Sequence, residues 1–123
     1  MHRILAIILG AAFACSLAAT AAFAHAFLDH AVPGVGATVS GSPSELKLTF
    51  TQSLVPAFAS VQIATAGGAP VSAGKATSDP ADPTTLHVRL GQPLKPGAYK
   101  VTWHVVSVDT HRTEGSYTFT VTP

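Results

Sequence analysis

The sequence predicts an all-β protein, a β-sandwich or Greek-key barrel formed by a single domain. Short stretches in which apolar and polar residues alternate recur along the chain after residue 24, as expected of strands with one buried face. Gly and Pro residues, 10 and 9 in the chain, punctuate these stretches as turns. No helical periodicity follows residue 24, and the remaining length of about 100 residues suits one core.

Residues 1–24 are predicted to be a secretory signal peptide. A basic start is followed by an apolar run from Ile4 to Leu17 and by Ala22-Phe23-Ala24, which fits the A-x-A cleavage pattern. The apolar run is shorter than the ~20 residues that a spanning helix needs. We therefore expect cleavage after Ala24 and export of the mature chain. Lipidation at Cys15, which poorly matches a lipobox, remains the alternative.

The predicted mature domain, residues 25–123, excludes several functions. The single Cys and the single Met precede it, so no disulfide, zinc-thiolate site, nucleophilic Cys or blue-copper centre can form. The seven Lys and Arg include Arg3, so six remain against six Asp and Glu. This balance gives no basic footprint for nucleic acid. Neither a phosphate-binding Gly loop nor a G-x-S-x-G motif is present.

The first part of the mature domain contains one clear strand. The chain from His25 to His30 is short and mixed, and residues 32–36 and 39–44 are rich in turn-forming residues. Residues 46–51 alternate cleanly, which predicts a strand whose buried face carries Leu46, Leu48 and Phe50.

The middle of the domain predicts a hairpin and a loop. A tight helical turn is expected at residues 56–58, near Pro56. A strand over residues 60–64 then turns back at Gly67-Gly68. Residues 74–83 contain two Asp-Pro pairs and are predicted to form a surface loop.

Three further strands are predicted in the last part. In residues 86–90 alternate apolar residues face inward, and His87 is expected to be exposed. Residues 99–105 form the longest predicted strand, with Trp103 on its core face and His104 on its outer face. Residues 116–121 close the chain with another alternating strand.

A candidate metal site combines Asp109, His111 and the predicted new N-terminus at His25. In an extended segment Asp109 and His111 would project on the same side. Cleavage before His25 would free an α-amine that can close a six-membered chelate with the Nδ1 of its own ring. Such nitrogen and oxygen ligands suit Cu(II). Because the amine must be deprotonated, binding should weaken on acidification.

The sequence resembles the CopC family of periplasmic copper-binding proteins over the whole mature domain. The resemblance rests on the start His25-Ala26-Phe27-Leu28-Asp29-His30-Ala31 and on the stretch from Gly97 to His111. It implies an Ig-like or cupredoxin-like Greek-key fold, and one Cu(II) per mature chain, held by His25, Asp109 and His111. Some members have Glu where Gln52 stands, so a fourth ligand is left open, and the family often has Gly where Thr110 stands.

The resemblance also implies a non-enzymatic role in copper buffering, delivery or resistance, with an inner-membrane CopD-type copper transporter as a possible partner. Some members bind Cu(I) through a Met-rich loop, which this chain lacks. We expect a monomer. Two alternatives stay open. One is a histidine-brace copper oxidative enzyme, although Asp109 would occupy coordination space and aromatic residues are few. The other is a metal-free Ig-like interaction module.

Overall fold

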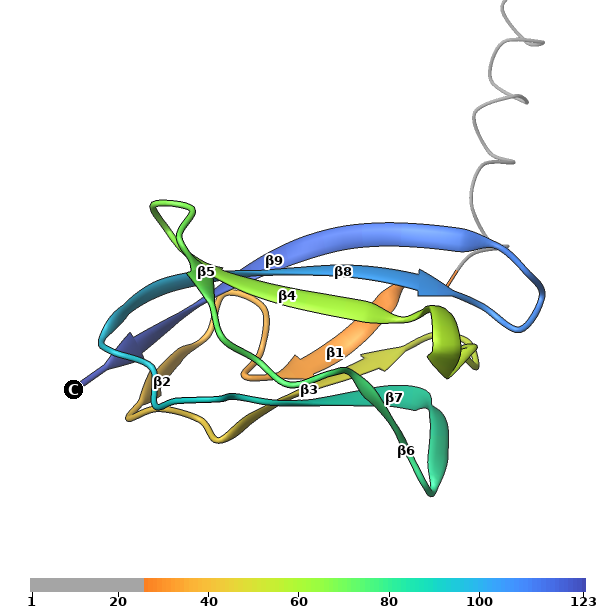
Figure 1. The fold of residues 1–123 in the computed structure, drawn as a ribbon, viewed down its shortest axis with the longest axis horizontal. Coiled ribbons are helices and arrows are strands. Elements are labelled where there is room, and N and C mark those ends of the chain that lie inside the picture. The colour runs from red at the N-terminus through yellow and green to blue at the C-terminus, as the bar shows by residue number, and fades with distance from the viewer. Residues whose placement is uncertain (1–25) are drawn as a thin grey trace, which may run out of the picture.

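A computed structural model describes residues 26–123, so the predicted signal peptide, Cys15 and His25 lie outside the described residues. The described chain is a sandwich of two β-sheets, which confirms the predicted fold class (Figure 1). Its elements are β1 (Leu28–Val32), β2 (Thr38–Ser40), β3 (Glu45–Phe50), η1 (Pro56–Phe58), β4 (Ser60–Thr65), β5 (Pro70–Val71), β6 (Thr77–Asp79), β7 (Asp82–Arg89), β8 (Gly97–Val106) and β9 (Arg112–Thr122). No helix within residues 26–123 is long and apolar enough to cross a membrane.

The two sheets differ in size. One has the strand order β1-β3-β7-β6 and the other β2-β9-β8-β4-β5. All strand pairs are antiparallel except β2 with β9. The long β8–β9 hairpin pairs continuously from Gly97 opposite Val121 to Val106 opposite Arg112. The hairpin is therefore regularly paired along its whole length, up to the turn at residues 107–111.

The core lies between the sheets and follows the predicted alternation. The predicted inward residues of β3, β4, β7, β8 and β9 are buried: Leu46, Leu48, Phe50, Val61, Ile63, Leu86, Val88, Tyr99, Val101, Trp103, Val105, Tyr117, Phe119 and Val121. The Trp103 ring packs edge-on against Phe50, with ring centroids 5.1 Å apart and planes at 79°. The two sheets are thus joined by aromatic contacts as well as aliphatic packing.

Three predictions about short elements are wrong. Strands β1 and β2 occupy parts of stretches that were predicted to be mixed or turns, and β6 lies inside the predicted loop 74–83. Each of these strands is at the edge of its sheet, so it pairs along one side only, and each buries few side chains. A clear apolar alternation is therefore absent from their sequences. The Asp-Pro pairs do form a turn, in which the Asp79 carboxylate accepts the Ala81 N–H at 2.8 Å.

Hydrogen bonds hold the start of the described chain close to the turn end of the β8–β9 hairpin. The Thr113 hydroxyl, on β9, donates to the Ala26 carbonyl at 2.7 Å. Phe27 is paired with Thr51 through N–H to Oγ1 at 3.0 Å and carbonyl to N–H at 2.8 Å. Figure 1 shows the first described residues beside the β8–β9 turn. Segments far apart in the sequence therefore meet at this end of the sandwich.

Candidate metal centre

The turn that joins β8 to β9 is closed by backbone hydrogen bonds. The Ser107 N–H donates to the His111 carbonyl at 3.0 Å, and the Thr110 N–H donates to the Ser107 carbonyl at 2.8 Å. Thr110 adopts a φ of 72°, in the left-handed region that favours glycine. The N–H of Val108 donates to the Ser53 carbonyl at 3.0 Å, which holds the turn against the segment after β3.

Asp109 and His111 meet on this turn. Their side chains approach through Asp109 Oδ2 and His111 Nδ1, which are 3.1 Å apart, and both are close to half exposed, at 43% and 47%. The expectation that these residues lie in an extended segment is wrong, because they belong to a tight turn. The turn nevertheless brings a carboxylate and an imidazole together at an accessible edge of the sandwich.

Ser107 controls the carboxylate of Asp109. Its side chain is fully buried, and its hydroxyl donates to Asp109 Oδ1. This hydrogen bond, followed by the one with the His111 side chain, holds the pKa of Asp109 below its usual value of 3.8. Asp109 is therefore ionised at neutral pH and fixed in direction. Sequence reasoning missed Ser107, although a Ser at the end of a strand is typical of a turn.

The remaining histidines of the described chain are engaged elsewhere. His30 pairs with its neighbour Asp29 at 2.8 Å. His104 is exposed on the outer face of β8, as predicted, and pairs with Glu114 across the hairpin at 2.8 Å. Within residues 26–123 no group of three or more His, Cys, Asp or Glu residues could hold a metal.

His87 is not the exposed histidine that the sequence predicted. Its side chain is only 25% exposed, and both ring nitrogens contact carboxylates: Nε2 lies 2.6 Å from Asp79 and Nδ1 lies 3.3 Å from Glu45. The hydrogen bond with Asp79, then that with Glu45, raises the pKa of His87 above 6.5 despite its partial burial. The cluster ties β3, β7 and β6 together, away from the β8–β9 turn.

Comparison with known proteins identifies the family. The family model of the CopC domain matches residues 28–122. The chain belongs to the CopC family. This CopC-family chain is 38% identical over 106 residues to "Protein YobA" of Escherichia coli K12, covering 86% of each chain. It is 35% identical over 113 residues to "Copper resistance protein C" of Xanthomonas campestris pv. juglandis, covering 88% of each.

Solved structures agree with the fold. The CopC structure from Methylosinus trichosporium OB3b matches with a TM-score of 0.75 and 35% identity, over 80% of this chain and 95% of that one. PcoC, described as a methionine-rich copper resistance protein from Escherichia coli, matches with a TM-score of 0.73 and 34% identity, over 80% of this chain and 100% of that one. The resemblance predicted from the sequence is confirmed, and membership of the family implies copper binding, a periplasmic location and a non-enzymatic role.

Proposed function

We propose that this CopC-family chain is a periplasmic Cu(II)-binding protein that holds one Cu(II) through His25, Asp109 and His111 and buffers or delivers it. The observation that carries the proposal is the Asp109–His111 pair on the β8–β9 turn, with donor atoms 3.1 Å apart beside the start of the described chain. The carboxylate is ionised and directed by Ser107, so it is ready to act as an oxygen ligand.

Covalent geometry supports His25 as the missing ligand. The Ala26 carbonyl accepts a hydrogen bond from the hydroxyl of Thr113, which lies two positions after His111. His25 directly precedes Ala26 in the chain, and consecutive Cα atoms are about 3.8 Å apart. Cleavage after Ala24 would leave an amine and an imidazole on His25. With the His111 ring, these give three nitrogens beside the one carboxylate oxygen of Asp109, a tetragonal set of the kind that Cu(II) prefers.

This ligand set favours a carrier over an oxidative enzyme. Asp109 would take a coordination position that an oxygen-activating copper needs open. A carrier requires a site that loads and unloads, and a site on an exposed turn meets that need. A CopD-type inner-membrane transporter is the partner that we propose for delivery.

The test is Cu(II) titration, against a competing chelator, of protein that begins at His25. Asp109→Asn and His111→Ala should each weaken binding by more than the roughly 10- to 100-fold typical of losing an outer partner of a ligand. Ser107→Ala keeps every proposed ligand and removes only the orienting hydroxyl, so its loss should fall within that 10- to 100-fold range.

His104→Ala is the matched control, because it removes one imidazole from the same hairpin and should leave the Cu(II) affinity unchanged. Urea denaturation of the metal-free variants should show an intact fold. Wild-type affinity in both Asp109→Asn and His111→Ala would overturn the assignment of the turn.

A further inference from the structure

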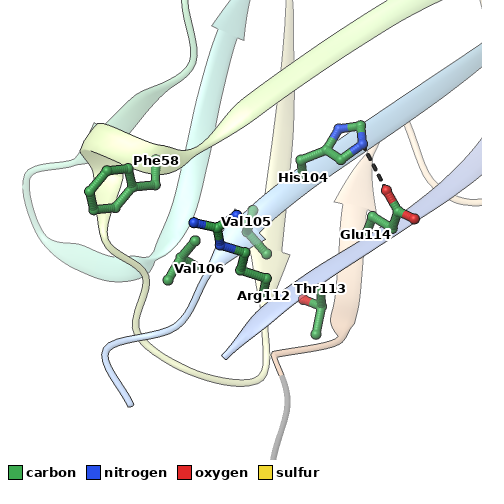
Figure 2. Close-up of a pocket in the computed structure, with 7 residues that line it drawn as sticks. All are labelled: Phe58, His104, Val105, Val106, Arg112, Thr113 and Glu114. Atoms are coloured by element: carbon green, nitrogen blue, oxygen red, sulfur yellow. Dashed lines mark ion pairs between the residues drawn. The ribbon is translucent and has the colours of Figure 1, made fainter. Parts of the chain in front are cut away.

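A hollow lies on the outer face of the larger sheet, next to the β8–β9 turn. It has a volume of about 550 Å³ and is open on one side. Figure 2 shows Phe58 on one flank, the His104–Glu114 pair on the other, and Val106 and Arg112 between them. We call it the Phe58–Arg112 hollow. None of its lining residues is a proposed copper ligand.

The two charged residues of the Phe58–Arg112 hollow, Glu114 and Arg112, differ in whether they have an ion-pair partner. Glu114 lines it, but its carboxylate is paired with His104 at 2.8 Å. Every ion pair among residues 26–123 involves a histidine, and none involves Arg112. The exposed Arg112 guanidinium therefore brings five N–H donors and a positive charge to the hollow without a carboxylate partner in the described chain. A carboxylate fits such a group by two parallel hydrogen bonds.

The apolar part of the hollow is held in place by backbone bonds. Phe58 is 66% exposed, more than any other large hydrophobic residue of the described chain. It ends η1, where its N–H donates to the Val55 carbonyl at 3.1 Å, and the Val55 N–H in turn donates to Val106 on β8 at 2.8 Å. The aromatic ring thus stands on a fixed backbone, which lowers the entropy cost of using it as a contact.

We propose that the Phe58–Arg112 hollow docks an acidic segment of a partner protein, with a carboxylate on Arg112 and an adjoining apolar side chain against Phe58 and Val106. Arg and aromatic residues are the types enriched at protein interfaces. An anionic membrane is a poorer match, because lipid surfaces attract clusters of Lys and Arg, and Arg112 is the one Lys or Arg among the lining residues. A small free carboxylate would leave the apolar flank uncovered.

Docking here has a consequence for metal transfer. Arg112 directly follows His111, so a segment in the hollow lies beside the Asp109–His111 turn. An acidic segment would bring oxygen ligands close to the copper proposed for that turn. This consequence rests on the proposed function, whereas the docking itself needs only the charge and shape of the hollow.

The experiment selects peptides from a displayed random library on metal-free protein that begins at His25. Enriched peptides should carry Asp or Glu within two positions of an aromatic or large aliphatic residue. A synthetic peptide of the enriched sequence should shift the backbone amide resonances of Phe58, Val106 and Arg112. Arg112→Glu should weaken its binding by about tenfold or more, and Phe58→Ser should weaken it without changing the charge.

Lys100→Glu is the matched control, because it makes the same charge change on β8, the strand paired with β9 of Arg112, and Lys100 lines a different depression. It should leave peptide binding within about twofold of wild type, the size expected of a distant surface charge. Enrichment of basic peptides, no enrichment, or equal binding by Arg112→Glu would overturn the proposal. The proposal would also be overturned if the library yielded no enriched peptide while the protein bound phosphatidylglycerol vesicles in a manner that depends on Arg112. If protein that begins at His25 binds the acidic peptide but does not bind Cu(II), the proposed function is refuted and the docking proposal stands.

Discussion

The contact between Gly115 and Trp103 offers a sharp test of the packing. Gly115 lies opposite Trp103 in the β8–β9 pair. A Cβ at Gly115 would stand 2.4 Å from Trp103 Cζ2 and 2.9 Å from Cε2. Ordinary carbon contacts are about 3.5 to 4.0 Å, so the ring would have to move by roughly 1 Å. Trp103 is only 5% exposed and is backed by Phe50, so it has little room to move.

Gly115→Ala should therefore lower the free energy of unfolding by about 1 to 3 kcal/mol, the usual cost of overpacking a core. For a domain of this size each 1 kcal/mol lowers Tm by roughly 4 to 8 °C. Backbone propensity alone predicts the opposite sign, because Gly within a strand is less stable than Ala by about 0.5 to 1 kcal/mol. Urea denaturation of protein that begins at His25 distinguishes the two outcomes.

Gly67→Ala is the control, because its nearest atom, Thr65 Oγ1, lies 3.9 Å from the added Cβ. Its stability should stay within about 0.5 kcal/mol of wild type. Trp103→Phe, with its smaller ring, should reduce the cost of Gly115→Ala in a double-mutant cycle. A Gly115→Ala variant at least as stable as wild type, or a cost unchanged by Trp103→Phe, would refute the predicted clash.

Three further outcomes are expected. Tyr117→Phe should leave the free energy of unfolding unchanged or raise it by about 1 to 3 kcal/mol, because the buried Tyr117 hydroxyl has no hydrogen-bond partner among residues 26–123. Burial also raises the pKa of Tyr117 to about 12. A clear loss of stability in urea denaturation would reveal a hidden partner. The raised pKa of His87 should make the stability it contributes, measured as wild type minus His87→Gln, full below pH 6.5 and lost as the pH rises through the raised value. Below pH 3.8 the same difference should fall again as Asp79, whose pKa is lowered mainly by its hydrogen bond with His87, takes up a proton; a difference independent of pH would contradict the cluster. Reduction of copper-loaded protein should release the metal to a moderate Cu(I) chelator, because residues 25–123 contain no Met or Cys, and retention would point to a missed site.

The sequence predicted the parts of the fold that depend on local alternation. In β3, β7, β8 and β9 a period of two fixes which residues face the core, and this needs no knowledge of the partner strand. Strand β2 could not be predicted in this way. It has three residues, and it is held by parallel pairing with β9, about 80 positions further along the chain.

The contact between Asp109 and His111 was predictable from the sequence, but its local geometry was not. The spacing of Asp109 and His111 indicated the pair, yet the turn that joins them depends on hydrogen bonds from Ser107 and on a left-handed Thr110. The environment of His87 was missed for a related reason. Its carboxylate partners come from two other strands, β3 and β6. The register of each of these strands against β7 cannot be read from the sequence of one strand alone.

We propose that the free amine of His25 is a copper ligand, and a one-residue extension of the chain tests this coordination. Protein that begins at His25 is compared in Cu(II) affinity with the same protein carrying one extra Ala before His25. The extension keeps every proposed ligand side chain and removes only the amine from its place, so Cu(II) binding should weaken by at least about 100-fold, more than the loss of an outer partner causes. Equal affinities for the two forms would exclude the amine as a ligand and leave a site made of side chains alone.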